Sequence, residues 1–169
     1  MQAVIRKYNI TFLVDEVIAG FGRTGNLWAS ETFGLKPDMM TCAKALSAAH
    51  LPISALLFGE ELHDIMVDQS NRNGVFGHGY TYAGHPVCAA VAVETLKIYE
   101  EIDYIGHIRR VAPRFMELMN ELADHPLVGE VRGVGLFCGL ELVADKTTRD
   151  PWDPAMKVGE MVMNAAHQH

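Results

Sequence analysis

The amino-acid sequence predicts an α/β fold built on an open, mainly parallel β-sheet, and three observations support this prediction. Two short apolar runs, residues 10–14 and 39–43, are each followed by a charged residue. Both runs are too short for a helix and are rich in β-branched or large apolar side chains, as buried strands are. Further along the chain, apolar residues recur at spacings of three and four, which indicates an amphipathic helix.

In the first half of the chain, residues that typically end or precede a helix or strand set the bounds of the expected elements. Residues 2–8 are expected to form the end of a helix that stops at Asn9, because asparagine tolerates a left-handed φ. Residues 10–14 then form the first strand. Pro37 forces extended geometry on its predecessor and so precedes the second strand at 39–43. The elements expected next are a third strand at 53–58, a short helix at 60–67 and a polar loop at 69–79.

In the second half, Pro86 suits the first position of a helix, which is expected to run to about Glu101 and to pack on both faces. Asp103 opens a further helix. Its apolar seam consists of Ile105, Ile108, Ala112, Phe115, Met119 and Leu122. Residues 132–143 predict a sheet strand, and residues 150–154 a loop before the last helix. We expect a domain boundary where the two long helices meet, which gives domains 1–102 and 103–169.

Composition excludes several classes of protein. The formal net charge of −7 argues against a general affinity for nucleic acid or anionic membranes. Three scattered cysteines form neither a complete disulfide framework nor a CxxC metal site, and they fit a reducing cytosol. The sequence shows no signal peptide and no apolar run of about 18 residues that could span a membrane. We therefore expect a soluble, cytoplasmic protein.

Two chemically active side chains follow the predicted strands. Asp15 follows the first and Lys44 follows the second, 44 − 15 = 29 positions later. In an open parallel sheet, ligands bind outside the carboxyl ends of the strands. A carboxylate and an amine at that edge could therefore act on one small molecule between them.

Three sequence blocks surround these residues. The first contains DEV at 15–17, GFGRTG at 20–25, PD at 37–38 and AK at 43–44. The second is HGYTYAGHP at 78–86, and the third is RGVGL at 132–136. In content and order these blocks resemble the class III, pyridoxal-phosphate-dependent aminotransferases. The resemblance implies the α/β fold of fold-type I pyridoxal enzymes. On that basis residues 1–102 are the later half of the large domain, and residues 103–169 the start of the small C-terminal domain.

The same resemblance assigns roles to five residues. Lys44 would form a Schiff base with pyridoxal 5′-phosphate and then carry a proton during catalysis. Asp15 would form a salt bridge to the protonated pyridine nitrogen, which makes the ring an electron sink, and Val17 would pack on the ring face. Thr81, with Tyr80 beside it, would bind the cofactor phosphate of the neighbouring subunit, which implies a homodimer with shared active sites.

The activity that the resemblance implies is transfer of an amino group from an amine or ω-amino acid to a 2-oxo acid such as pyruvate, in a two-stage cycle through pyridoxamine phosphate. Alternatives are an aminomutase or a decarboxylase of the same family. The resemblance also implies that the phosphate-binding glycine/serine loop and part of the small domain lie outside these 169 residues. The isolated chain is therefore expected to be inactive, or to act only as an assembly partner.

Other candidate sites have ordinary explanations. GFGRTG matches the GxGxxG dinucleotide fingerprint, but it does not directly follow a strand, so we expect its glycines to serve close backbone packing and regard a dehydrogenase as the weakest alternative. The eight histidines form neither HxxxH nor HExxH, so no metal site is expected.

Glu16 should point away from Asp15 and is given no catalytic role. Arg132 is as suited to structural hydrogen bonding as to substrate contact. Alanines follow Lys44 where the family often has glycines, and because alanine disfavours positive φ, the turn is expected to differ from that of relatives.

Overall fold

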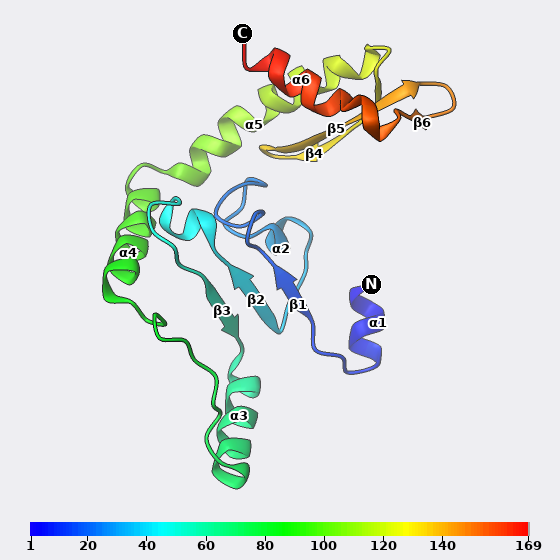
Figure 1. The fold of residues 1–169 in the computed structure, drawn as a ribbon. Helices are drawn as coiled ribbons and strands as arrows, with labels where there is room; N and C mark the ends of the chain where they lie inside the picture. Colours follow the sequence, from blue (N-terminus) through cyan, green and yellow to red (C-terminus); the bar gives the residue numbers. More distant parts are fainter. Residues whose placement is uncertain (169) are drawn as a thin grey trace. The chain divides into compact units, whose positions relative to one another are not determined.

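The computed structural model of the protein describes residues 1–168. These form two compact units, residues 1–108 and 109–168. The first unit contains, in chain order, α1 (Gln2–Lys7), β1 (Leu13–Asp15), α2 (Ala29–Thr32), β2 (Met39–Cys42), the 3₁₀ turn η1 (Lys44–Ser47), β3 (Ala55–Phe58), α3 (Glu60–Asn73) and α4 (Pro86–Glu101) (Figure 1). Helix α5 (Tyr104–Glu121) begins in this unit, and the boundary between the units falls within it. The domain boundary expected at 102/103 stays a prediction.

A three-stranded sheet with the order β1-β2-β3 organises the first unit. Strands β1 and β2 are parallel, with Asp15 opposite Thr41, whereas β2 and β3 are antiparallel (Figure 1). The link from β2 to β3 holds only the short η1 turn and no crossover helix, so the chain reverses direction. The sheet expected to be mainly parallel is therefore mixed in this region.

The first strand begins later than the sequence pattern predicts, at Leu13 instead of residue 10. The carboxylate of Asp38 accepts a hydrogen bond from the Phe12 amide at 2.8 Å, so a side chain occupies the place of a strand partner there. Asp38 also forms an ion pair with Arg6 of α1 at 2.7 Å. The Phe12 amide and the Arg6 guanidinium together hold the pKa of the Asp38 carboxyl below its usual range.

The core of the first unit lies where the GFGRTG turn, β2, η1 and α4 meet. Its buried members are Phe21, Cys42, Leu46 and Ala92. The Trp28 ring packs against the Phe21 ring in a tilted arrangement, with ring centroids 4.9 Å apart and planes at 58°. Helix α4 spans residues 86–101 as predicted, but it buries one face only and leaves side chains such as Val93 and Leu96 exposed. The expected packing on both faces is therefore not found in this chain.

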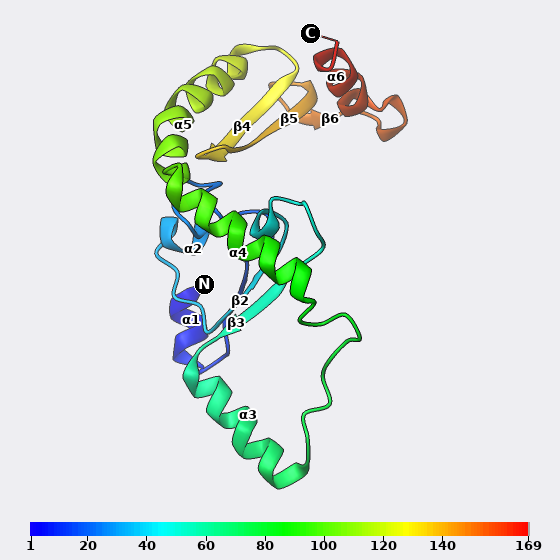
Figure 2. The same cartoon turned by 90° about the vertical axis from the view of Figure 1, so that its left-hand side faces the viewer.

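Helix α3 is longer than expected and continues to Asn73, so it takes up residues 69–73 of the predicted loop at 69–79, while residues 74–79 have no regular secondary structure. Two interactions over one helical turn support its end: an ion pair between Asp68 and Arg72, and a hydrogen bond from Asn73 to Gln69. Gly74, with φ +99°, ends the helix. A long segment with no regular secondary structure then returns to α4 (Figure 2).

The second unit contains an antiparallel sheet in the order β4-β5-β6. Its elements are η2 (Leu122–Asp124), β4 (Val128–Val134), β5 (Phe137–Asp145), β6 (Asp150–Pro151), η3 (Pro154–Met156) and α6 (Val158–Ala166). The single strand predicted at 132–143 is wrong, because these residues form a hairpin. Gly135, with φ +64°, is the first residue of its two-residue turn, which is where such hairpins favour glycine. Within residues 1–168, no helix has both the length and the apolar character of a membrane span.

Candidate active site

Asp15 and Lys44 lie at the same edge of the first sheet. Asp15 is the last residue of β1, and Lys44 begins η1 two residues after β2 ends at Cys42. Because β1 and β2 are adjacent and parallel, their carboxyl ends meet at one edge (Figure 1). This is the edge of an open sheet where ligands bind.

The Asp15 carboxylate is anchored through one of its two oxygens. Its Oδ1 accepts a hydrogen bond from the Val17 amide at 2.9 Å and another from the Thr41 hydroxyl at 3.1 Å. Within residues 1–168, Oδ2 makes no hydrogen bond or ion pair. The two hydrogen bonds to Oδ1 thus fix the orientation of the carboxylate, while Oδ2 remains able to accept a hydrogen bond.

Lys44 has an unusual backbone conformation for its residue type. Its φ is +46°, in the left-handed region that non-glycine residues seldom adopt. Its amine makes no hydrogen bond or ion pair with the other residues of 1–168, and the side chain is exposed. A disfavoured backbone conformation held by surrounding structure is characteristic of functional sites.

The turn after Lys44 adopts positive φ although it contains no glycine. Ala48 has φ +48° and Ala49 has φ +61°. Alanine therefore does adopt positive φ here, contrary to the premise drawn from the sequence, and a difference from the turn of relatives stays a prediction. Hydrogen bonds from the Ala49 amide to the Lys44 carbonyl at 3.0 Å and from the Ser47 hydroxyl to the Leu51 carbonyl at 2.7 Å close the turn in spite of the strain.

Glu16, the neighbour of Asp15, is fully buried, with 0% exposure. Its carboxylate accepts hydrogen bonds from the amides of Ser30 at 2.7 Å and Ala29 at 3.0 Å, the first residues of α2. A negative charge at a helix start satisfies amides that have no partner within the helix. Glu16 thus holds the segment after the GFGRTG turn to the end of β1.

The GFGRTG turn serves backbone packing. A Cβ added to Gly22 would lie 2.6 Å from Cδ1 of Ile108 and 2.9 Å from Cδ1 of Ile105, so the backbone passes directly against the start of α5. The glycines neither follow β1 directly, since residues 16–19 intervene, nor open a helix, since α2 begins only at Ala29; a dinucleotide site needs both. The sequence-based interpretation of these glycines is therefore confirmed.

Tyr80 and Thr81, the predicted phosphate-binding residues, lie in the long segment between α3 and α4 (Figure 2). Both are exposed, and 77% of Tyr80 is accessible. The Tyr80 ring contacts the His78 ring edge-on, with ring centroids 5.5 Å apart. Among residues 1–168, no hydrogen bond joins Tyr80 or Thr81 to Asp15 or Lys44, and the phosphate-binding role of this pair stays a prediction.

The remaining candidates are Arg132, the three cysteines and a possible metal site. Arg132 forms ion pairs with Glu141 at 2.8 Å and Glu130 at 3.1 Å, both on its own hairpin, and these carboxylates raise its pKa. Cys42, Cys88 and Cys138 are free thiols, and burial raises the pKa of Cys42. The part of the chain that is described contains no group of three or more His, Cys, Asp or Glu side chains able to hold a metal ion.

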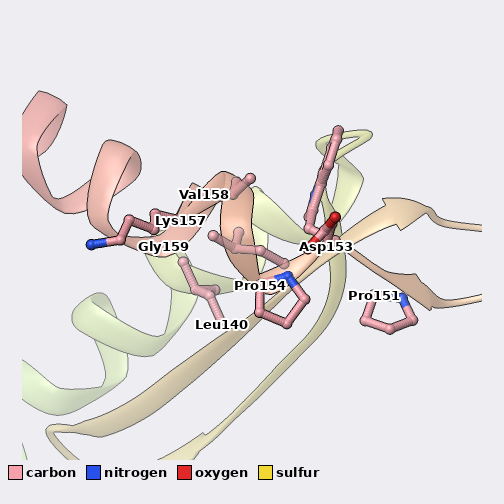
Figure 3. A pocket seen from close by; sticks show the side chains of 9 residues that line it. Leu140, Pro151, Asp153, Pro154, Lys157, Val158 and Gly159 are labelled. Carbon is pink, nitrogen blue, oxygen red and sulfur yellow. The ribbon is translucent and has the colours of Figure 1, made fainter.

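A hollow of about 410 Å³ in the second unit contains none of the predicted site residues (Figure 3). Its lining is mainly apolar and includes Leu140, Leu142 and Trp152. The amine of Lys157, at its edge, is paired with Glu160 at 3.2 Å. The Asp153 carboxylate accepts a hydrogen bond from the Ala155 amide at 2.9 Å, so both charged side chains of the lining have local partners.

Sequence patterns alone did not reveal two residues that shape this edge. Thr41 orients Asp15, and its place opposite Asp15 follows only from the strand register. Tyr99 of α4 donates a hydrogen bond to the carbonyl of Ala45 at 2.8 Å, across 54 positions of sequence. Nothing local in the sequence indicates such a contact.

Comparison with known proteins places this geometry in a family. The model for aminotransferase class III matches residues 1–169. The chain is 46% identical, over 94% of its length, to γ-aminobutyrate transaminase 3, chloroplastic, of Solanum lycopersicum, and covers 31% of that protein. It is 43% identical over its whole length to γ-aminobutyrate transaminase 2 of the same plant and covers 37% of it. The chain thus spans about a third of the length of these curated relatives.

Solved structures agree in fold. A transaminase from a directed-evolution and ancestral-reconstruction series superposes with a TM-score of 0.90 at 47% identity, over 94% of this chain and 35% of that one. The ω-transaminase of Pseudomonas jessenii in complex with PMP superposes with a TM-score of 0.86 at 45% identity, over 90% of this chain and 34% of that one. The α/β fold expected from the sequence, that of fold-type I pyridoxal enzymes, is confirmed. The chain belongs to the class III aminotransferase family.

Proposed function

We propose that this protein is an aminotransferase that moves an amino group from an amine or ω-amino acid to a 2-oxo acid such as pyruvate. The observation that carries the proposal is the placement of Asp15 and Lys44 at the adjacent carboxyl ends of two parallel strands, one with a free carboxylate oxygen and the other with a free amine. Relatives named γ-aminobutyrate transaminases support an ω-amino acid as the donor.

The residues present fit pyridoxal phosphate, the cofactor of class III aminotransferases. Asp15 Oδ2 is available to accept a hydrogen bond from a protonated pyridine nitrogen, and the Lys44 amine is available to attach to an aldehyde. When bound, the cofactor supplies that aldehyde and a ring that takes up the electron pair left when a substrate Cα loses its proton. Val17, next to the anchored carboxylate, is the residue we assign to the ring face.

Each residue of the edge then has a defined task. Asp15 would keep the proton on the ring nitrogen, and the Thr41 hydroxyl and the Val17 amide hold Asp15 in the orientation for that role. The Lys44 amine would hold the cofactor through its aldehyde and, when free, would act as the base that takes the proton from the substrate Cα.

Tyr80 and Thr81 would bind the cofactor phosphate across a homodimer interface. Their segment is exposed, and the aromatic side chains of Phe76, Tyr80 and Tyr82 on it have most of their surface accessible in the single chain. An apolar segment of this kind is suited to burial against another subunit. We therefore propose a homodimer in which this segment completes the partner's site.

We also propose a cytoplasmic location, which the free cysteines support. Some of the named relatives are chloroplastic or mitochondrial, so cell fractionation with an antibody to the protein is the deciding measurement.

The proposed reaction is tested by turnover. A protein that contains this chain at the full length of its relatives is incubated with pyridoxal phosphate, γ-aminobutyrate and pyruvate, and alanine is measured. Lys44→Ala should form none, and Asp15→Asn should bind the cofactor but lose about a hundredfold to a thousandfold in rate. Lys36→Ala, which removes an exposed lysine outside the edge, is the matched control.

Two outcomes would refute the proposed reaction. An Asp15→Asn variant with undiminished turnover would remove Asp15 from the mechanism. Products of isomerisation or carbon dioxide release in place of alanine would identify an aminomutase or a decarboxylase instead.

A further inference from the structure

The turn that presents Lys44 is conformationally strained at both ends. Lys44, Ala48 and Ala49 all have left-handed φ values, between +46° and +61°. Each such residue is disfavoured when it carries a Cβ. The turn can persist only if contacts outside it hold it in this form.

The far end of the turn is held by local contacts. The Ser47 hydroxyl donates to the Leu51 carbonyl at 2.7 Å, and the Ala49 amide donates to the Lys44 carbonyl at 3.0 Å. These bonds join residues at most five positions apart. They close the turn on itself and do not tie it to another element.

The near end is tied to helix α4 through Tyr99. The carbonyl oxygen of Ala45, the residue after Lys44, accepts two hydrogen bonds: one from the Ala48 amide at 3.2 Å and one from the Tyr99 hydroxyl at 2.8 Å. A carbonyl oxygen has two lone pairs, so the two bonds together fix the plane of this peptide group. The Tyr99 bond is the one that comes from outside the turn.

Tyr99 is itself held in place. Its ring stacks on Tyr104 with centroids 4.7 Å apart and planes 16° from parallel, and it packs against the core cluster that contains Leu46. Burial, and after it the neighbouring Tyr104, raises the pKa of Tyr99, while Arg23 lowers it by less. The phenol therefore remains protonated, and able to donate, across the physiological pH range.

We propose that Tyr99 is a positioning residue for Lys44: its hydroxyl locks the peptide after Lys44 and so holds the strained turn that directs the amine to the sheet edge. The inference rests on the proposed function in so far as Lys44 is the reactive amine. The geometric part, that the Tyr99 hydroxyl holds the turn, can be tested without any cofactor.

The first test is hydrogen exchange on the cofactor-free protein. Tyr99→Phe removes the hydroxyl but keeps the ring and its stack. Tyr104→Phe is the matched control, since it removes a hydroxyl from the other ring of the same stack, and that hydroxyl makes no hydrogen bond within residues 1–168. Tyr99→Phe should speed exchange of the Ala48 and Ala49 amides about fivefold, the equivalent of one ordinary hydrogen bond. Tyr104→Phe should leave these amides unchanged, and the amides of β2 and β3 should not respond to either variant.

The second test is the rate at which Lys44 becomes attached to pyridoxal phosphate at saturating concentration, trapped by borohydride and read from the Lys44 peptide by mass spectrometry. Tyr99→Phe should slow attachment several-fold relative to Tyr104→Phe, because the amine is less often in position. A purely structural role would leave this rate unchanged once the protein is folded.

The outcomes separate the two claims. The inference is overturned if Tyr99→Phe and Tyr104→Phe behave alike, or if exchange accelerates equally in β2, β3 and the turn, which would make the hydroxyl a source of general stability. If the wild-type protein never attaches the cofactor to Lys44, the proposed function fails, and the exchange experiment still decides whether Tyr99 holds the turn.

Discussion

At the scale of single residues, the turn after Lys44 combines two opposing requirements. Its hydrogen bonds need left-handed φ at positions 48 and 49, and the sequence supplies alanine at both. A left-handed alanine costs about 1–2 kcal/mol relative to its preferred conformation. Packing in the surrounding core, in which Leu46 and Ser47 are buried, offsets this conformational cost.

We predict that Ala49→Gly stabilises the protein. Glycine removes the steric cost at φ +61°, but it loses more chain entropy on folding than alanine does. The net effect should be a rise of about 0.5–1 kcal/mol in the free energy of unfolding. Urea denaturation monitored by circular dichroism gives the value. Ala45→Gly in the same turn is the control, since Ala45 does not have positive φ, and it should destabilise by about 0.5–1 kcal/mol. Equal effects from the two substitutions would contradict the account of strain.

At the scale of elements, the GFGRTG turn matters because it lets α5 approach closely. Gly22 has φ +101° and contacts the buried side chain of Ile108. This glycine therefore meets both a conformational and a spatial requirement. Gly34, after α2, meets only the first, because its φ is +61° and no atom lies within 4 Å of an added Cβ.

We predict that Gly22→Ala destabilises the protein by about 2–4 kcal/mol, as the sum of backbone strain and overpacking against Ile108. Gly34→Ala should cost about 1 kcal/mol, from backbone strain alone. Thermal unfolding of both variants separates the two contributions. If Gly34→Ala proved as damaging as Gly22→Ala, close packing of α5 would not be the reason for the glycine.

Elements that depend on local patterns could be predicted from the sequence. The strand that leads to Lys44 and helix α4, which begins at Pro86, were found because apolar runs and a proline at the first helical position are local signals. The positive φ of Asn9 was likewise expected. Asp15 and Lys44 could be placed at one edge because parallel strands align their ends.

Features that depend on contacts distant in sequence could not be predicted. The late start of β1 depends on the Asp38 side chain, 26 positions from the Phe12 amide that it binds. The sequence pattern predicts one strand at 132–143, within the hairpin at 128–145, because the two-residue turn lies in an alternating pattern that does not show a reversal of the chain. Tyr99 and Glu16 gave no signal because their partners are brought near only by folding.

At the scale of the whole molecule, each unit contains a carboxyl whose pKa is held below its usual range. In the first unit this is Asp38, through the Phe12 amide and Arg6. In the second it is Asp145, through the amides of Thr148 and Thr147, at 3.1 and 2.7 Å. A carboxyl with a lowered folded pKa stabilises the protein above the pKa of the unfolded chain and loses that contribution as the pH falls through the folded pKa.

We therefore predict that both units lose stability as the pH falls below about 4, the ordinary aspartate value. Asp38→Asn should flatten this dependence for the first unit, and Asp145→Asn should flatten it for the second. Hydrogen exchange of β2 and of β4 between pH 3 and pH 6 reports each unit separately. A slope in β2 that survives Asp38→Asn would show that other groups control its acid sensitivity.

The proposed chemistry depends on the Lys44 amine and the Asp15 carboxylate holding one pyridoxal phosphate at the edge of the first sheet. The most direct measurement is borohydride reduction of the protein with pyridoxal phosphate, followed by mass spectrometry of its peptides. The account predicts the cofactor on the Lys44 peptide, its retention in Asp15→Asn, and its absence in Lys44→Ala. Attachment to other lysines, with Lys44 unmodified, would contradict it.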